Sequence, residues 1–358
     1  MNNYNNLKKT FNGKKVFITG NTGFKGSWLS IILLELGAKV YGYALKPLTE
    51  NDNFITTELA SKVNQIYADI RNIKILRETI IEINPDFVFH LAAQPLVLES
   101  YINPSETFEI NMMGTVNLFE CIKECNNIKV AINVTSDKCY ENKEWIWGYR
   151  ENDPMGGRDP YSASKGCSEL ITNSYINSFF QADSTCLIGS ARAGNVIGGG
   201  DWADNRIVPD FFRSFKNKKT LTIRNPNSTR PWQHVLEPLF GYLTLASKLL
   251  EEGKSLQGGW NFGPKVNTHK TVENLIDTLK KDIRINNVQI EYVPPNFHEA
   301  NFLKLDITKA ITQLDWRPIL NFEQTIAFTI QGYLDEINDK GNVYGCRVKQ
   351  IEAYKKLF

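Results

Sequence analysis

The chain has 358 residues, of which 42% are hydrophobic, and its 41 basic and 39 acidic side chains leave a formal net charge of +2. A chain of this length can bury about three-quarters of its unfolded surface and is long enough for about two domains. The balanced charge excludes the long-range field that favours nucleic acids or membrane surfaces as partners. Without a signal-peptide pattern or a membrane-spanning apolar stretch, the sequence predicts a cytoplasmic protein with a polar, frayed start over residues 1–9. The six cysteines and four histidines lack zinc-ligand spacing, so no metal centre is predicted.

The first predicted element is an apolar strand over Lys15–Ile18, followed by a glycine-rich turn and a helical segment that Gly37 ends. The turn reads Thr19-Gly20-Asn21-Thr22-Gly23-Phe24-Lys25-Gly26. This order is the context of a dinucleotide-binding fingerprint, because glycine lets the backbone approach a pyrophosphate at the positive end of the helix. The glycine spacing is GxxGxxG rather than GxGxxG. A purely structural turn is the alternative, but the context favours a cofactor site.

Strand and helix signals alternate through the first half of the chain. Further strands are predicted at 39–44, 66–70, 87–93 and 130–135, with helices near 72–83 and 107–125. The alternation predicts an α/β fold with a Rossmann-type doubly wound parallel sheet over residues 1–194. Ligands of such sheets bind beyond the carboxyl ends of the strands. The glycine-rich turn, Asp69, Ala92–Gln94 and Thr135–Lys138 all lie at such ends, so one cleft is expected to gather them.

The second half of the chain is less regular, which predicts two interleaved domains rather than two in series. Residues 195–234 and 262–330 are predicted to form a smaller α/β substrate lobe over the cleft. Residues 235–261 are expected to return to the dinucleotide-binding domain. Residues 331–358 have the pattern of a helical tail with a basic end.

Tyr161 and Lys165 are one helical turn apart, so their side chains face the same side of a helix. The ammonium of Lys165 is expected to hold the phenol toward its anionic form, which makes Tyr161 a candidate general base. Tyrosine and lysine at this spacing also occur by chance on solvated helices. The glycine-rich turn in the same domain favours the catalytic interpretation.

Several sequence blocks resemble a known family. The TGxxGFxG turn, the HLAAQ segment, the asparagine of NMMGT and the YxxxK pair are similar to the extended short-chain dehydrogenase/reductases, the NAD-dependent epimerases and dehydratases of nucleotide sugars. Within this family, the blocks TSDKCYEN, WGYRENDPMGGRDPYSASKGCSEL, RAGNVIGGGDWADNRIVPD, RPWQHVLEPL and HEANFLKLD resemble the CDP-glucose 4,6-dehydratases. The resemblance runs from about residue 11 to residue 316.

The resemblance implies that CDP-glucose loses water to give CDP-4-keto-6-deoxy-glucose. C4 is oxidised with NAD, water is eliminated across C5 and C6, and hydride returns to C6. Tyr161 with Lys165 would take the proton of the C4 hydroxyl, and Thr135 would hydrogen-bond that hydroxyl. Asp137 would be the acid for the 6-hydroxyl if burial raises its pKa.

Many relatives have a glutamate as the C5 base where this chain has Lys138. Either a deprotonated Lys138 is the base, or its ammonium stabilises the enolate while another group takes the proton. A solvated loop lysine without a catalytic role is the alternative.

NAD is the expected cofactor, because a reaction that returns its hydride regenerates a tightly held cofactor. The acidic residue that usually binds the ribose hydroxyls is missing, and Lys46 with Lys25 could instead favour an NADP phosphate. The resemblance implies that the cofactor contacts Gly20, Thr22, Gly23, Phe24, Lys25, Gly26, Asp69, Ile70, Leu91, Ala92, Ala93, Gln94, Asn111, Tyr161 and Lys165.

The resemblance also implies that the substrate contacts Gln94, Ser136, Asn195, Arg206, Arg230 and Glu299. Arginine suits a diphosphate because its planar fork binds phosphate oxygens in pairs. Arg192 either does the same or braces its strand. Relatives pair helices of the dinucleotide-binding domain, which implies a homodimer.

Three alternatives stay open. They are a 4,6-dehydratase of another nucleotide sugar, an NDP-sugar 4-epimerase on the same scaffold, and a redox-silent nucleotide-binding regulator. The intact Thr135, Tyr161 and Lys165 argue against the regulator, because a binding module has no use for a phenolate.

Overall fold

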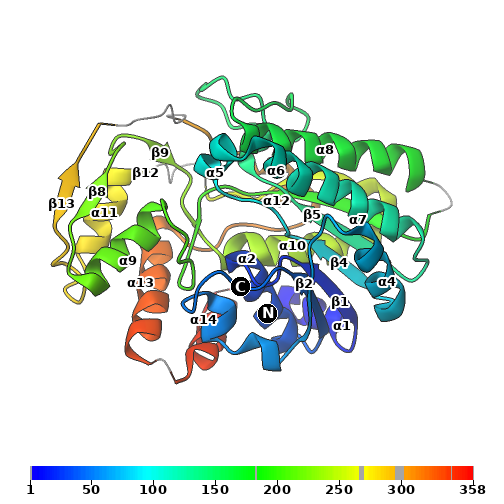
Figure 1. Cartoon of the computed structure of the whole chain (residues 1–358), viewed down its shortest axis with the longest axis horizontal. Coiled ribbons are helices and arrows are strands. Elements are labelled where there is room, and N and C mark those ends of the chain that lie inside the picture. Colours follow the sequence, from blue (N-terminus) through cyan, green and yellow to red (C-terminus); the bar gives the residue numbers. More distant parts are fainter. Residues whose placement is uncertain (1, 182–183, 266–269, 295–301, 340, 358) are drawn as a thin grey trace.

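Seven parallel strands form the central sheet of the computed structural model, which describes residues 2–181, 184–265, 270–294, 302–339 and 341–357. Their order is β11-β6-β5-β4-β1-β2-β3. Strands β5, β4, β1 and β2 are labelled in Figure 1. The strands are β1 Lys15–Thr19, β2 Lys39–Ala44, β3 Asn64–Tyr67, β4 Phe87–His90, β5 Val130–Val134, β6 Leu187–Arg192 and β11 Gly258–Asn261. The order reverses between β1 and β4, where a doubly wound sheet opens its ligand crevice. The predicted Rossmann-type fold is confirmed. Strand β11, which lies within residues 235–261, pairs with β6 in this sheet.

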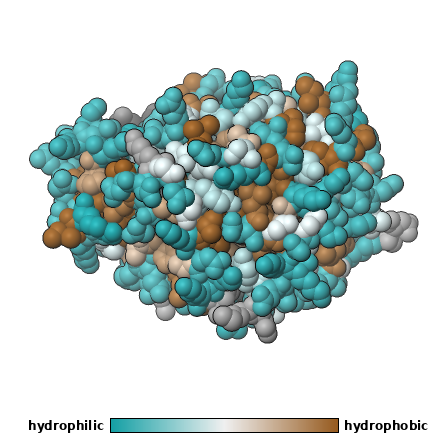
Figure 2. Space-filling model, turned by 90° about the horizontal axis from the view of Figure 1, so that it is seen from below, coloured by the Kyte–Doolittle hydropathy of each residue, from teal (hydrophilic) through white to brown (hydrophobic). Residues whose placement is uncertain are grey.

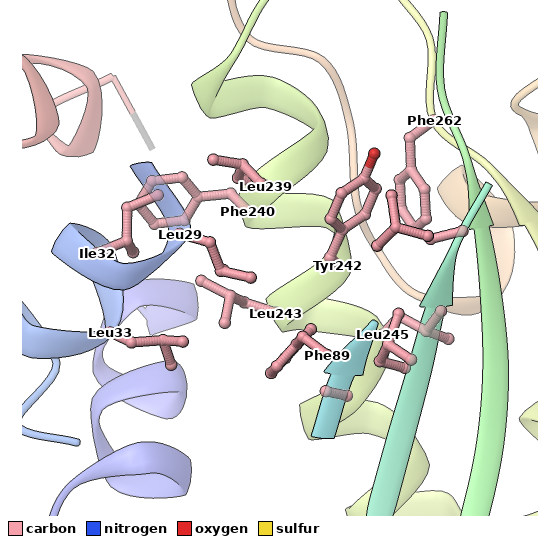
Figure 3. Close-up of a cluster of buried hydrophobic side chains, with 14 of the residues drawn as sticks. Leu29, Ile32, Leu33, Phe89, Leu239, Phe240, Tyr242, Leu243, Leu245 and Phe262 are labelled. Atoms are coloured by element: carbon pink, nitrogen blue, oxygen red, sulfur yellow. The ribbon is translucent and has the colours of Figure 1, made fainter. Parts of the chain in front are cut away.

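Helices cover both faces of the sheet because successive side chains of each strand point to opposite sides. Val16 and Ile18 of β1 belong to the core that contains α2 and α10, whereas Phe17 packs with α4, α7 and α8. Figure 3 shows the first core, with Phe89 of β4 between leucines of α2 and α10. These helices are α2 Phe24–Glu35, α4 Ile73–Ile83, α7 Gly114–Lys123, α8 Pro160–Phe179 and α10 Leu236–Glu252.

The start of the chain is a helix, α1 (Asn2–Phe11), and not the frayed segment predicted from its polarity. Tyr4, Leu7 and Phe11 are buried, at a spacing that places them along one side of the helix. The ring of Phe11 lies 4.9 Å from that of Phe87 in β4. Three apolar residues are therefore enough to anchor a segment that is otherwise polar.

Two predicted boundaries shift near the cleft. Strand β3 ends at Tyr67 instead of residue 70, because Asp69 turns the chain by accepting the backbone N–H of Asn72. The helix predicted at 107–125 begins earlier and contains a π-helical turn, Glu109–Met113, between α6 (Pro104–Phe108) and α7. Such turns often occur at functional sites, and this one contains Asn111.

A separate core forms the smaller lobe, which includes α9 Ile207–Asn217, β8 Leu221–Ile223, α11 Val272–Lys280, β13 Ile290–Tyr292 and α13 Phe322–Asn338. The predicted boundary at residue 331 lies inside α13, so the lobe extends to residue 338. In contrast, Ile307 and Trp316, which were expected in the lobe, pack into the large core of the dinucleotide-binding domain.

The last helix, α14 (Val343–Lys355), packs on α2. Arg347 of α14 is buried, donates to Asn53 and to the carbonyl of Gly332, each at 2.9 Å, and pairs with Glu336. The tail is therefore an integral part of the fold.

The remaining elements are short. They are α3 Asn53–Thr56, α5 Val97–Ile102, β7 Val196–Ile197, β9 Thr229–Arg230, β10 Gln233–His234, β12 Lys270–Thr271, α12 Thr308–Gln313 and the 3-10 turns Leu59–Ser61, Asp137–Cys139 and Gly253–Leu256. The face seen in Figure 2 is mostly hydrophilic, with its hydrophobic residues in several separate patches. In the part of the chain that the structure describes, no helix is both long and apolar enough to cross a membrane.

Candidate active site

The glycine-rich turn brings the backbone of β1 close to the end of β4. Gly20 has φ +72°, and a Cβ at this residue would lie 2.6 Å from the backbone nitrogen of Ala92. A Cβ on Gly26 would lie 2.2 Å from the carbonyl oxygen of Gly20. The next helix, α2, starts after Gly23 without a side-chain cap. Its first N–H groups therefore face an anion-binding position, as a dinucleotide pyrophosphate requires.

Two residues of the turn occupy different surroundings. The hydroxyl of Thr22 donates to the carbonyl of Leu45, in the loop after β2, at 3.0 Å. Phe24 is half-buried against the large core. Both contacts fix the turn rather than leave it free.

Lys25, predicted to contact the cofactor, lies within electrostatic range of the predicted catalytic residues Lys165 and Asp137. Its Nζ lies 3.5 Å from the hydroxyl of Tyr242 in α10. Burial, followed by the charges of Lys165 and Arg206, lowers the pKa of Lys25 to about 8. Lys46, in contrast, is exposed. The two lysines therefore do not form a common site for an NADP phosphate.

Asp69 and Ile70 follow β3, where the adenine end of a dinucleotide is expected. The carboxylate of Asp69 pairs with Arg71 at 2.7 Å, and hydrogen bonds from Arg71 lower the pKa of Asp69. Ile70 is buried against α7, where a Cβ on Gly114 would approach its side chain to 2.9 Å. Arg71 therefore lies beside a predicted cofactor residue, which the motifs did not indicate.

The segment after β4 is held in place by Asn111. The backbone N–H of Leu91 donates to the carbonyl of Thr19 at 3.0 Å, and Ala92 and Ala93, which follow, are half-buried. Asn111 accepts the backbone N–H of Gln94 at 2.8 Å and donates to its carbonyl at 3.0 Å.

Asn111 and Gln94 were expected to contact ligands, but their side-chain amide N–H groups donate hydrogen bonds to other groups of the protein. The second N–H of Asn111 bonds Ser164 of α8 at 2.9 Å. The side-chain amide of Gln94 donates to the carbonyl of Leu96 at 3.1 Å and to the hydroxyl of Thr107 at 2.9 Å. In this structure both side chains position the strand end.

Tyr161 and Lys165 lie in the first turns of α8, which Asp159 caps by accepting the N–H of Ser162 at 2.9 Å. Burial raises the pKa of Tyr161 to about 12, with Ser136 lowering it in part. The expected shift toward the anionic form is therefore not present in the protein alone. Burial also lowers the pKa of Lys165 to about 8, and its Nζ donates to the carbonyl of Val134 at 3.5 Å.

The residues after β5 face the same region. Asp137 is buried, with 3% of its surface exposed, and accepts the hydroxyl of Ser136 at 3.0 Å. Lys138 is half-buried in the same 3-10 turn. A Cβ on Gly194 would lie 1.7 Å from the Oδ2 atom of Asp137. Gly194 thus makes the space for this carboxylate, a role that the motifs did not indicate.

Thr135 donates its hydroxyl proton to Glu169, a buried carboxylate one helical turn beyond Lys165. The same carboxylate accepts Arg192 at 2.7 Å, so Arg192 braces its strand and is not a free phosphate ligand. Neither Glu169 nor its contact with Thr135 was predicted, because the partners lie 34 residues apart in the sequence.

Three of the predicted substrate residues, Asn195, Arg206 and Arg230, lie in the lobe or at its border. Asn195 has φ +47°, directly after Gly194. Arg206 pairs with Asp201 at 2.9 Å, and this carboxylate raises the pKa of Arg206. Arg230 lies in β9, which pairs antiparallel with β12. Glu299 lies outside the described residues.

Electrostatic coupling shows which of these groups share one region. The charge of Asp137 acts on Lys25, Tyr161 and Tyr242, and the charge of Arg206 acts on Lys25 and Tyr161. Tyr242 is the member that the sequence did not reveal, because it lies in an apolar helical run typical of a core. Figure 3 shows its hydroxyl beside Phe262. Among the described residues, no group of three or more His, Cys, Asp or Glu could hold a metal ion.

The family model of GDP-mannose 4,6 dehydratases matches residues 17–329. The chain belongs to this family. A CDP-glucose 4,6-dehydratase of Salmonella typhimurium is 48% identical over 97% of this chain and 98% of the relative. A CDP-paratose 2-epimerase of Salmonella typhi is 25% identical over 85% of this chain and 94% of that protein.

Solved structures of other sugar-nucleotide enzymes share the fold of this GDP-mannose 4,6 dehydratase family member. A Thermotoga maritima UDP-glucose 4-epimerase aligns with a TM-score of 0.76 at 21% identity, covering 90% of this chain and 99% of the other. A Bacillus anthracis dTDP-glucose 4,6-dehydratase in complex with NAD aligns with a TM-score of 0.73 at 22% identity, covering 92% and 98%.

Proposed function

We propose that the chain is an NAD-dependent CDP-glucose 4,6-dehydratase, which converts CDP-D-glucose to CDP-4-keto-6-deoxy-D-glucose and water. The observation that carries the proposal is the 48% identity to a CDP-glucose 4,6-dehydratase over nearly the full length of both chains. The grouping of Asp137, Tyr161 and Lys165 at the strand ends supports it.

The glycine-rich turn fits a dinucleotide. Its glycines leave no room for side chains, and the uncapped start of α2 offers N–H groups to a pyrophosphate. NAD, when bound, would take hydride from C4 and return it to C6, and its positive charge would favour ionisation of the phenol.

For the first step, Tyr161 accepts the proton of the C4 hydroxyl. Its pKa of about 12 in the protein alone means that the resting group is a phenol, which must first release its proton to solvent; the phenolate that results is a strong base. Lys165, buried beside the end of β5, offers an ammonium that stabilises the phenolate. Thr135 completes this group at the end of the same strand.

For the elimination, a buried Asp137 protonates the departing 6-hydroxyl, and Lys138 acts at C5. The ammonium of Lys138 either loses its proton and becomes the base or stabilises the enolate. Arg206 and Arg230 hold the diphosphate from the lobe, and Asn195 lies at the border between lobe and cleft.

The proposal is tested by incubating the protein with CDP-, UDP-, GDP- and dTDP-hexoses and following the mass of each nucleotide sugar. We expect loss of one water from CDP-glucose. No change in any CDP-hexose would refute the substrate, and an unchanged mass with inverted C4 would identify an epimerase. Cofactor released from denatured protein should be NAD, and NADP would refute that part of the proposal.

We also propose a cytoplasmic homodimer. Tyr101, Ile102, Met113 and Leu170 are large hydrophobic residues with between 43% and 71% of their surface exposed, and they lie on or beside α5, α7 and α8 of the dinucleotide-binding domain. Pairing these helices would remove that surface from water. Light scattering should give twice the chain mass, and Leu170→Glu should give a monomer. A wild-type monomer would refute the dimer.

A further inference from the structure

A buried carboxylate lies behind the catalytic group and has no part in the reaction as proposed above. Glu169 of α8 has 4% of its surface exposed, and Thr135 also has 4% exposed. One oxygen of Glu169, Oε1, accepts the hydroxyl of Thr135. The other, Oε2, accepts Ser190 and Arg192, each at 2.7 Å.

These contacts keep Glu169 ionised. Burial alone would raise its pKa, but Arg192 and the hydrogen bonds from Ser190 and Thr135 hold the pKa below its ordinary value. An ionised carboxylate can only accept hydrogen bonds. The proton between Thr135 and Glu169 therefore comes from the threonine.

A threonine hydroxyl has one proton and two lone pairs. Because the proton of Thr135 points at Glu169, only lone pairs are left for the cleft. Thr135 lies directly after β5, whose end also holds Lys165 through the carbonyl of Val134. The direction of the Thr135 hydroxyl thus decides whether this residue donates or accepts a hydrogen bond toward a ligand.

We propose that Glu169 is a positioning residue for Thr135, which by taking the threonine's only proton makes Thr135 a hydrogen-bond acceptor toward the sugar. The inference rests on the proposed function, because it requires that Thr135 meets the C4 hydroxyl. Thr135 then offers no proton to the phenolate of Tyr161, so the base keeps its strength. The single proton of the C4 hydroxyl faces two acceptors, a lone pair of Thr135 and the phenolate, and it passes to the phenolate because that is by far the stronger base.

Glu169→Gln tests the inference because it keeps the shape of the side chain. Its amide can still accept Arg192 and Ser190 through oxygen, but it presents N–H to Thr135 and so turns the threonine proton toward the cleft. We expect kcat to fall about tenfold, with KM for CDP-glucose within about threefold, because the nucleotide supplies most of the binding. A loosened fold would instead change KM and lower the melting temperature.

A double-mutant cycle with Thr135→Val separates the two residues. If Glu169 acts through Thr135, Glu169→Gln should cost less than about twofold in the Thr135→Val background. Ser190→Ala is the matched control, since it removes another hydroxyl from Glu169 but leaves Thr135 in contact, and it should stay within about threefold of wild type.

Two outcomes would overturn the inference. One is a loss from Glu169→Gln that is equally large in both backgrounds, as expected if its charge acts on Lys165 instead. The other is full activity of Glu169→Gln. If Glu169→Gln does not fold, the cycle is repeated in an Arg192→Met background. This second substitution removes the buried cation that Glu169→Gln leaves without its carboxylate. Wild-type protein that dehydrates no CDP-glucose would refute the proposed function alone, and the cycle would then use the nucleotide sugar that is turned over.

Discussion

The carboxylate of Asp137 occupies the space that a side chain on Gly194 would need, since a Cβ there would lie 1.7 Å from Oδ2. These residues end two neighbouring strand regions, β5 and β6, whose backbones are paired in register. The acid proposed for the elimination therefore owes its position to a glycine 57 residues further along the chain.

Gly194→Ala should displace Asp137 and lower kcat for dehydration by about 100-fold, because a misplacement of about 1 Å can cost that much. The measurement is steady-state turnover of CDP-glucose together with thermal unfolding. Gly263→Ala is the control, since its Cβ would meet its nearest neighbour, Ile307, at an ordinary 3.5 Å. Equal activity of both variants would contradict the spatial role of Gly194.

Lys138→Ala should lower turnover by about 100-fold or more, as expected for loss of a group that acts in proton transfer. Oxidation of C4 should persist, because Tyr161 and Lys165 are unchanged. Formation of reduced cofactor in a single turnover reports the oxidation, and deuterium incorporation at C5 in heavy water reports the second step. Wild-type turnover and wild-type C5 exchange would remove Lys138 from the mechanism.

Glu237→Gln should remove a pH dependence of stability. Burial raises the pKa of Glu237 from 4.5 to about 7, while its carboxylate accepts the N–H of Leu320 at 2.6 Å and the hydroxyl of Tyr354 at 2.8 Å. The folded protein thus binds a proton that the unfolded chain has released. The resulting stabilisation is complete below about pH 4.5 and is lost as the pH rises through about 7, a change of about 3 kcal/mol.

Urea unfolding of wild type and Glu237→Gln should therefore differ with pH. Glutamine can accept the N–H of Leu320 through its oxygen and donate to Tyr354. The free energy of unfolding of the variant should therefore increase relative to that of wild type as the pH rises toward about 8. Glu352→Gln, at an exposed ion pair with Lys355, is the control and should follow wild type. A constant difference at every pH would argue against titration of Glu237.

Arg206→Lys should raise KM for CDP-glucose about tenfold with less than about threefold change in kcat, because lysine lacks the planar fork that binds phosphate oxygens in pairs. Arg284→Lys, at the surface pair with Asp282, is the control. An unchanged KM would place the diphosphate elsewhere in the lobe.

Much of the fold could be predicted because its signals are local. The glycine-rich turn stands between an apolar strand and a helix, and the alternation of strands and helices is specific for a parallel sheet. Boundaries were harder to predict. The polar start of the chain forms α1 because Tyr4, Leu7 and Phe11 reach the core, and α13 continues through residue 331 because its buried face belongs to the lobe.

The sequence by itself determined the family, the dinucleotide-binding turn and the pair Tyr161 and Lys165, since each depends on residues within one strand, turn or helix. Only the tertiary structure decided which distant residues the side chains contact. It placed Lys25 beside Tyr242, turned Arg192 toward Glu169 and made Gly194 the neighbour of Asp137. These contacts join segments far apart in the chain, and burial then sets their pKa values and hydrogen-bond directions, which no local pattern encodes.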